Sequence, residues 1–335
     1  MYCLISTFNK TFDDLGLLYF VPSFLEEEIK IGQIVEVPIW TKIEIWVVLK
    51  IWTLEKLNIL DIEEEKIKSL ISIKNENIFL NKKQIELVFF IAKYYFSPIH
   101  NALSLFFPKN LREKIKKNKF KAPPSPPLEG GIEVSKYNFN FNKKLSKKQE
   151  EIFEKIAPPS PPLKGGSRKN NKFLLHWITG SWKTEIYIKL IKKQLDNWKQ
   201  SLLLIPEIIL TNQLEERLKK VFWENILVIN SSITESLKTK AWISIYQNQA
   251  KIIIWTRSAL FYPYSDLWLI IIDEEHDSSY ISDKAPRYNS IEVANKIIDL
   301  YWNKLLLASW TPSIKSMYMA VKGKYQLLKL LEKFG

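Results

Sequence analysis

The sequence predicts an α/β fold in which a lobe built on a parallel sheet follows a small β-rich domain. Within residues 31–49, apolar and polar side chains alternate, which is typical of short strands with one buried face. From residue 173 onward, apolar strand-like runs alternate with helical patterns, which is typical of a parallel sheet covered by helices. The predicted strands of that sheet are 173–178, 201–205, 226–229, 251–254, 267–272 and 304–307.

The chain is predicted to have three segments. Residues 1–112 form the β-rich domain, and its end is helical because 82–107 has a helical period with a stop near Pro98. Residues 113–144 form a linker, and residues 145–335 form the parallel-sheet lobe.

Two nearly identical proline-rich strings interrupt this organisation, APPSPPLEGG at 122–131 and APPSPPLKGG at 157–166. Proline at this density excludes helices and central strands, so both copies are predicted to be exposed loops. The fidelity of the repeat favours inserted repetitive DNA, and a docking site for a proline-binding partner is the alternative.

Composition and charge favour a soluble protein with a polyanionic partner. The chain has 335 residues, of which 46% are hydrophobic, enough to build the cores of two or more domains. Its net charge of +13 and its pI of about 9.4 favour nucleic acid, although an AT-rich genome also enriches lysine. Because the chain shows no membrane-length apolar run and no signal peptide, we expect a cytoplasmic protein without membrane contact. Cys3 is the only cysteine, so neither a disulfide nor a cysteine zinc site can form within the chain.

Residues 177–184 read WITGSWKT, which fits the phosphate-binding pattern G-x-x-x-x-G-K-[ST] except at its two glycines. Trp177 and Trp182 occupy the glycine positions, whereas Lys183 and Thr184 are in register. Phosphate loops need glycine because their backbone adopts conformations closed to residues with a Cβ and approaches phosphate oxygens closely. An indole at either position is expected to fill the phosphate site.

Tryptophan replaces glycine elsewhere as well. The chain has 9 glycines and 12 tryptophans, whereas average usage would give roughly 23 glycines. Tryptophan stands where turns or strand ends ordinarily carry glycine at Trp40, Trp198, Trp223, Trp255, Trp268 and Trp302. Some bacterial lineages read UGA as glycine, so a translation that reads UGA as tryptophan produces this pattern. We interpret most of these tryptophans as glycines, and the alternative is a tryptophan-rich protein with a degenerate loop.

Residues 269–276 read LIIIDEEH, an apolar strand that ends in carboxylates. In a phosphate-loop sheet, such a strand places Asp273 at Mg²⁺ and Glu274 beside the attacking water, while His276 links the site to the rest of the molecule. An acidic cluster after a strand is ordinarily a solvated loop. The pairing with Lys183 and Thr184 upstream favours the functional interpretation.

Six strings resemble successive motifs of the primosomal protein N′ (PriA) family of superfamily 2 DNA helicases. They are TGSWKTEIY at 179–187, IPEIILTNQ at 205–213, WTRSALF at 255–261, DEEHDSSY at 273–280, APRY at 285–288 and ASWTPS at 308–313. The resemblance covers nearly the whole chain and implies a RecA-like P-loop helicase lobe over 145–335, preceded by a 3′ DNA-binding domain over 1–112. In that domain, VEVPIW at 35–40 resembles the family's VxVPFG. Trp46 and most of the tryptophans named above fall on family glycines, whereas Trp242 matches a family tryptophan.

The resemblance implies roles for individual residues. Lys183 would bind the β- and γ-phosphates of ATP, Thr184 and Asp273 would bind Mg²⁺, Glu274 would activate water and Gln149 would recognise adenine. Gly180 and Ser181 complete the phosphate loop, and Ser309 and Thr311 lie in the motif that couples hydrolysis to movement. The residues implied to contact DNA are Trp40, Thr211, Gln213, Thr256 and Arg257. For the residues outside the phosphate and carboxylate groups, the alternative role is ordinary capping or turn chemistry.

The chain departs from the family pattern in two further places. About thirty residues separate Arg112 from Lys143, so the family's winged-helix domain is expected to be absent or vestigial. The chain stops before the family's cysteine-rich zinc region and second helicase lobe, so zinc is expected in the family but its cysteines are not in this chain.

Two functions of different classes remain. The first is an ATP-dependent 3′→5′ DNA helicase of replication restart, with ATP and Mg²⁺ as cofactors. Its partners would be single-stranded and forked DNA together with primosome and single-strand-binding proteins. The second is a fork-binding or single-strand-binding fragment without catalysis. Lys183, Thr184, Asp273 and Glu274 favour the first for the parent protein, because a decayed loop is not expected to keep these partners.

Overall fold

The computed structural model describes residues 1–7, 16–39, 42–53, 67–75, 77, 79–117, 119–120, 144–157, 171–206, 212–222, 226–229 and 233–332. Trp40, Thr211 and Trp223 lie outside the described residues. The first proline-rich string, the second one after Ala157 and most of the segment expected to be a linker also lie outside the described residues.

The N-terminal part is a five-stranded sheet with the order β2-β1-β4-β3-β5, and the described pairings are antiparallel. Its strands are β1 (Tyr2–Ser6), β2 (Leu17–Phe20), β3 (Ile34–Ile39), β4 (Lys42–Trp52) and β5 (Ser72–Asn75). The alternation read from the sequence buries one set of side chains against the core, as Val35 and Val37 in β3 illustrate. A short 3-10 helix, Ser23–Leu25, follows β2. The β-rich domain is thereby confirmed.

Three helices follow this sheet: α2 (Lys82–Tyr94), α3 (Ile99–Ser104) and α4 (Lys109–Lys116). Asn81 starts α2 with a capping box, because its side chain accepts from Gln84 N while the Gln84 side chain accepts from Asn81 N. The segment 82–107, whose sequence has a helical period, therefore forms the two helices α2 and α3, and Pro98 separates them as expected.

The second part is a seven-stranded parallel sheet with the order β12-β6-β11-β10-β7-β9-β8. Its strands are β6 (Lys172–Trp177), β7 (Gln200–Leu204), β8 (Ile226–Val228), β9 (Ile252–Trp255), β10 (Leu267–Asp273), β11 (Lys304–Ser309) and β12 (Gln326–Leu330). The structure confirms the predicted parallel α/β lobe. It adds the edge strand β12, which the sequence reading did not identify.

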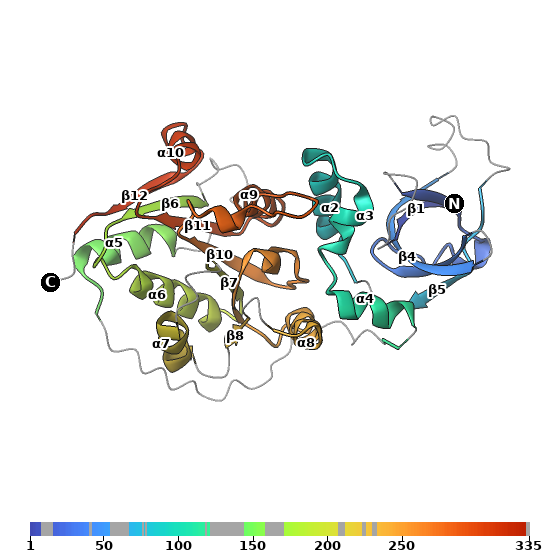
Figure 1. Cartoon of the computed structure of the whole chain (residues 1–335), viewed down its shortest axis with the longest axis horizontal. Coiled ribbons are helices and arrows are strands. Elements are labelled where there is room, and N and C mark those ends of the chain that lie inside the picture. Colours follow the sequence, from blue (N-terminus) through green and yellow to red (C-terminus); the bar gives the residue numbers. More distant parts are fainter. Residues whose placement is uncertain are drawn as a thin grey trace.

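Helices cover both faces of this sheet (Figure 1). One face packs against α5 (Lys147–Ile156), α6 (Lys183–Asp196) and α7 (Asn212–Phe222). The other packs against α8 (Glu235–Tyr246) and α9 (Ser290–Tyr301), and α10 (Ile314–Val321) precedes the edge strand β12. Shorter 3-10 helices occupy Arg257–Phe261 and Ser278–Tyr280.

The two parts share one hydrophobic core, with α2, α3 and α4 between the two sheets (Figure 1). Trp242 of α8 is fully buried, stacks on Phe107 and donates its indole N–H to the backbone O of Phe106 at 2.8 Å. Phe79 lies against the same indole. Trp242 therefore packs at the junction between the two parts.

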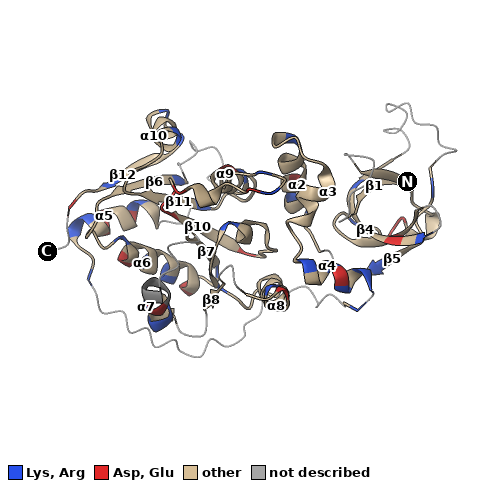
Figure 2. Ribbon diagram, in the orientation of Figure 1, with Lys and Arg blue, Asp and Glu red and all other residues tan. Residues whose placement is uncertain are grey.

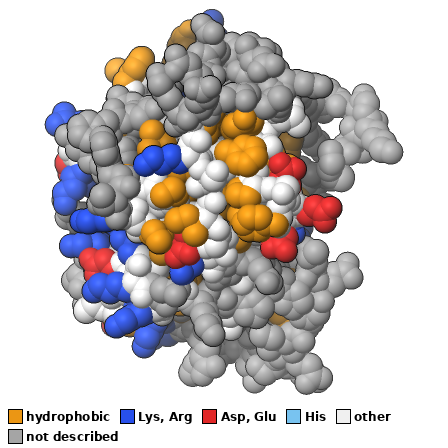
Figure 3. Space-filling model, turned by 90° about the vertical axis from the view of Figure 1, so that its right-hand side faces the viewer, with side chains coloured by type: hydrophobic (Ala, Val, Ile, Leu, Met, Phe, Trp, Pro, Cys, Tyr) orange, Lys and Arg blue, Asp and Glu red, His pale blue; other side chains and the backbone are white. Residues whose placement is uncertain are grey.

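Basic side chains lie on both parts, and α4 carries Arg112, Lys114 and Lys116 (Figure 2). Figure 3 views the end formed by the N-terminal part, where hydrophobic side chains gather with basic side chains to one side. The exposed large hydrophobic residues of this part include Phe24, Ile43 and Ile71. Among the residues that the structure describes, no helix is long and apolar enough to cross a membrane.

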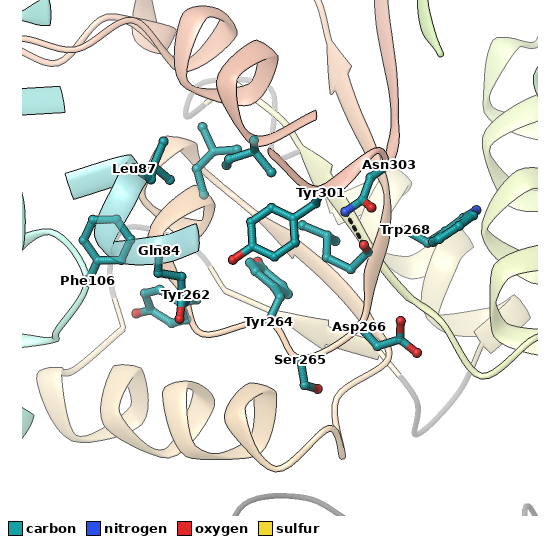
Figure 4. Close-up of a pocket in the computed structure, with 13 residues that line it drawn as sticks. Gln84, Leu87, Phe106, Tyr262, Tyr264, Ser265, Asp266, Trp268, Tyr301 and Asn303 are labelled. Carbon is teal, nitrogen blue, oxygen red and sulfur yellow. Dashed lines mark hydrogen bonds between the residues drawn. The ribbon is translucent and has the colours of Figure 1, made fainter. Parts of the chain in front are cut away.

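A cavity of about 150 Å³ lies where α2 meets the seven-stranded sheet (Figure 4). Gln84 and Leu87 line it from α2, and Tyr262, Tyr264 and Tyr301 line it from the second part. It also borders Asn303, which precedes β11. The cavity is thus at the amino-terminal edge of the parallel strands, opposite the edge where ligands of such sheets ordinarily bind.

Candidate nucleotide and DNA site

Lys183 lies between the two carboxylates that the sequence singled out. Its ammonium donates to Asp273 Oδ1 and to Glu274 Oε1, each at 2.6 Å. Lys183 is the first residue of α6, which follows β6, and Asp273 ends β10. The carboxyl ends of parallel strands meet at one edge of a sheet, so groups ninety residues apart in the chain become neighbours.

The two carboxylates have different surroundings. Asp273 is buried and accepts from the hydroxyl of Tyr187 at 3.0 Å and from the backbone N of Glu274 at 3.1 Å. Glu274 has a left-handed backbone, with φ 48°. Burial raises the pKa of the Glu274 carboxyl, and Lys183 opposes that shift. A carboxylate with a raised pKa is a better proton acceptor, as a residue that activates water needs to be.

Trp177 stacks against the same lysine. Its ring centroid is 3.6 Å from Lys183 Nζ, and the indole is buried at the end of β6 with its N–H lacking a partner among the described residues. Lys183, Asp273 and Glu274 are the chemical groups that a magnesium-bound nucleotide requires. The Trp177 ring takes space beside Lys183 that phosphate oxygens would need, so the loop fits a nucleotide only with a small residue at 177.

Trp182 and Gly180 give the phosphate loop its backbone shape. Gly180 has φ 81° and Trp182 has φ 53°, both left-handed. Trp182 immediately precedes α6, and its side chain is exposed. Ser181 is buried, and its hydroxyl has no partner within the described part of the chain, whereas Thr184 lies in the first turn of α6. The structure therefore places a glycine-like conformation at the second glycine position of the pattern.

The same conformation recurs at Trp198 and Trp302, with φ 60° and 62°. Each stands just after a helix, and each ring is exposed. Left-handed backbone after a helix is where glycine is most favoured. By contrast, Trp46 and Trp255 are buried within strands, and the ring of Trp255 packs against Tyr262, so the conformational argument does not extend to them.

The codons provide a direct check on this interpretation. We expect UGA at the codons of Trp177, Trp182, Trp198 and Trp302, because these positions either fill the phosphate site or need a left-handed backbone. We also expect UGA at Trp40, Trp223, Trp255 and Trp268, which the pattern in the sequence marked. Trp242 should be encoded by UGG, since its indole is hydrogen-bonded in the core. Sequencing the gene decides the question, and UGG at both Trp177 and Trp182 would contradict the interpretation.

Gln149 lies under the phosphate loop. It is buried in the first turn of α5, and its amide donates to the backbone O of Ser181 at 2.9 Å and lies 3.3 Å from that of Trp182. Its carbonyl oxygen accepts from Ser146 N, which completes a capping box. In this conformation Gln149 holds the loop, and its amide is engaged there.

The residues expected to contact DNA are only partly described. The side chain of Thr256 is buried, and Arg257 donates to the backbone oxygens of Ser279 and Ile281 at 2.6 and 2.7 Å. Arg257 thus clamps the loop that follows the carboxylates. Trp40, Thr211 and the side chain of Gln213 lie outside the described residues.

His276 and Glu275 join the carboxylate strand to the segment after β11. His276 Nδ1 is 2.7 Å from Ser309 Oγ. The Glu275 carboxylate, which is buried, accepts from the backbone N of Ser313 at 2.6 Å and from the hydroxyls of Ser313 and Ser316 at 3.1 and 3.0 Å. Glu275 was not singled out from the sequence, and the available signal was the pair of serines, Ser313 and Ser316, that stand at the start of α10.

Comparison with known proteins covers both parts of the chain. Residues 142–312, just over half of the chain, match the family model described as type III restriction enzyme, res subunit. Residues 6–108 match the model of the PriA 3′DNA-binding domain (3′BD).

The curated relatives that the chain matches include three proteins named replication restart protein PriA. The protein of Bacillus subtilis is 41% identical over 58% of this chain and 25% of its own length. That of Helicobacter pylori strain 26695 is 32% identical over 90% of this chain and 42% of its own length. That of Rickettsia felis is 31% identical over 95% of this chain and 44% of its own length. The chain thus spans less than half the length of these relatives.

One model covers both the phosphate loop and the carboxylate strand, while the other covers the preceding β-rich part. The chain therefore belongs to the type III restriction enzyme res-subunit family, and over both of its parts it matches the amino-terminal half of PriA replication restart proteins.

Proposed function

We propose that this chain is the DNA-end-binding domain and first motor lobe of an ATP-dependent 3′→5′ DNA helicase. The helicase would act in replication restart and primosome assembly at stalled forks, in the cytoplasm. The observation that carries the proposal is the contact of Lys183 with Asp273 and Glu274 at one edge of a parallel sheet. A second motor lobe is needed to complete such an enzyme, so the chain alone is expected to be weakly active or inactive.

The residues of the site divide the work between them. Bound Mg²⁺–ATP supplies the phosphate bond whose cleavage drives movement. With a small residue at 177, Lys183 would neutralise phosphate charge, and Thr184 and Asp273 would hold the metal. Glu274, whose carboxylate lies beside Lys183, would accept a proton from the attacking water. His276 and Glu275 connect these groups to Ser309 and α10.

DNA is the partner that the N-terminal part supports, through its match to a 3′DNA-binding domain and the net charge of +13. Primosome proteins and single-strand-binding proteins are the protein partners that the replication-restart role implies. Residues that contact backbone phosphates carry no sequence information, so binding would be independent of DNA sequence. Among these we propose Thr211, Gln213, Thr256 and Arg257, of which Arg257 would first have to release Ser279 and Ile281. Trp40 is proposed to contact DNA from the N-terminal part.

Binding to branched DNA tests the proposal. We expect the chain to bind a fork with a free 3′ end more tightly than a blunt duplex of equal length. The affinity should fall on the order of tenfold or more between low and moderate salt, because phosphate contacts release counterions. Gel-shift titrations at several salt concentrations measure the preference for the fork and the salt dependence of the affinity, with a fork that lacks the 3′ end as control. Equal binding of the fork and the blunt duplex at moderate salt would contradict the proposed recognition of a free 3′ end.

A fork-binding fragment without catalysis is the second candidate, and the Trp177 ring beside Lys183 favours it. In that case DNA binding would persist while nucleotide binding stays absent even with glycine at 177 and 182. Nucleotide binding therefore separates the two functions.

A further inference from the structure

The loop between β10 and α9, residues 274–289, begins at the carboxylate site and is tied to it by Tyr280. The Tyr280 hydroxyl is buried, 2.5 Å from the backbone O of Asp273 and 3.1 Å from that of Leu204. Tyr280 is thus hydrogen-bonded to the backbone of Asp273 itself. Because buried hydroxyls are costly to leave unpaired, this contact is expected to persist when the loop moves.

The far end of the loop is tied back to the same tyrosine. Ser290, the first residue of α9, donates its hydroxyl to the backbone O of Tyr280 at 2.9 Å. Asn289 caps α9 by accepting from Ile291 N at 2.8 Å, and Ser282 N donates to the backbone O of Tyr288 at 2.8 Å. The start of α9 and the carboxylate site are thus joined by a short chain of hydrogen bonds.

Tyr95 of the N-terminal part reaches the end of this loop. It stands immediately after α2, and its hydroxyl accepts from the backbone N of Asn289 at 3.1 Å and lies 3.4 Å from the backbone O of the same residue. Burial raises the pKa of the Tyr95 hydroxyl to about 12, so it stays protonated and can both donate and accept at neutral pH. One hydroxyl from the DNA-end-binding part therefore contacts Asn289, the residue that caps α9.

We propose that Tyr95 is a positioning residue that transmits a movement of α2 on DNA binding, through Asn289, Ser290 and Tyr280, to the backbone of Asp273. The inference rests on the proposed function, because it assumes that the N-terminal part binds a DNA end. It assigns Tyr95 no contact with nucleotide or DNA. A chain of contacts is not by itself coupling, so the inference needs a response measured at the loop.

The chain offers a matched control. Tyr301 also bridges the two parts through its hydroxyl, which donates to Asn81 Oδ1 at 3.0 Å. Tyr301 lies at the opposite end of α9 from Asn289, and its bond does not involve the loop. Tyr95→Phe and Tyr301→Phe each remove one hydroxyl from the same junction, so a general loosening of the junction would affect both variants alike.

Hydrogen–deuterium exchange of residues 277–289 provides the test, with a hairpin DNA whose 3′ overhang is too short to reach the motor lobe. We expect DNA to change exchange of this loop in the unmodified chain and in Tyr301→Phe, and we expect loss of that change in Tyr95→Phe. DNA affinity and thermal stability should be the same in the two variants.

Each other outcome is informative. A DNA-induced change that persists in Tyr95→Phe, or one that Tyr301→Phe loses equally, would overturn the role of Tyr95. Tight DNA binding without any change in loop exchange in the unmodified chain would also overturn it. If the unmodified chain fails to bind the hairpin at all, the proposed function fails first, and the affinity measurement shows this separately.

Discussion

Replacing both Trp177 and Trp182 by glycine is expected to create binding of Mg²⁺–ATP. The centroid of the Trp177 ring lies 3.6 Å from Lys183 Nζ, so the ring blocks that side of the ammonium. Trp182 is held in a left-handed backbone that costs a residue with a Cβ roughly 1–2 kcal/mol. With glycine at both positions, backbone N–H groups and Lys183 can surround the phosphates. We expect the affinity to rise on the order of 100-fold or more, which corresponds to about 2.7 kcal/mol.

Isothermal titration with ATP and Mg²⁺ measures this change. Trp198→Gly together with Trp302→Gly serves as the control, since these positions share the left-handed backbone but are distant in sequence from the loop. That control should be at least as stable as the unmodified chain and should bind no more nucleotide. Equal nucleotide binding by the unmodified and the Trp177→Gly/Trp182→Gly chains would show that the indoles do not obstruct the site.

Hydrolysis is expected to stay slow in that glycine variant until the rest of a PriA-length protein is present. The chain covers 25–44% of the length of the three relatives described above. In phosphate-loop enzymes an arginine supplied from elsewhere stabilises the transition state and contributes on the order of 10³-fold or more to the rate. Fusing the carboxy-terminal half of a relative should therefore raise DNA-stimulated phosphate release by a comparable factor.

Two substitutions at the site are the controls for that rate. Lys183→Ala and Glu274→Gln should each abolish turnover in the fused protein. The first removes the ammonium that binds phosphate, and the second removes the carboxylate that accepts the proton. A Tyr301→Phe variant of the fusion should retain turnover, since Tyr301 contacts Asn81 and not the site. Rapid DNA-stimulated hydrolysis by residues 1–335 alone would mean that no second lobe is required.

The parallel sheet was predictable because its strands are continuous apolar runs separated by helical patterns, and each predicted strand is present in the structure. The edge strand β12 escaped prediction because Gln326–Leu330 mixes polar and apolar residues, as a strand with one exposed side does. The split of 82–107 into α2 and α3 followed from Pro98, whose ring cannot continue a helix.

The candidate site was predictable only in its parts. The sequence named Lys183, Asp273 and Glu274, and the structure brings them into contact. It could not show that Gln149 binds loop carbonyls or that Arg257 binds the loop after the carboxylates, because both contacts depend on tertiary packing. The roles of Tyr95 and Tyr280 also depend on tertiary packing, since tyrosines near helix ends are ordinarily core residues.

The burial of Trp242 against Phe79, Phe106 and Phe107 bears on how such chains can recombine. The ranges that the two family models match lie on either side of the expected linker, which suggests a boundary there between two exchangeable modules. The packing offers no such clean division, because α2 to α4 belong to a core that the motor lobe and the N-terminal sheet share. A chimera assembled from two relatives would keep its packing intact only if α2, α3 and α4 were inherited together with the lobe that carries Trp242.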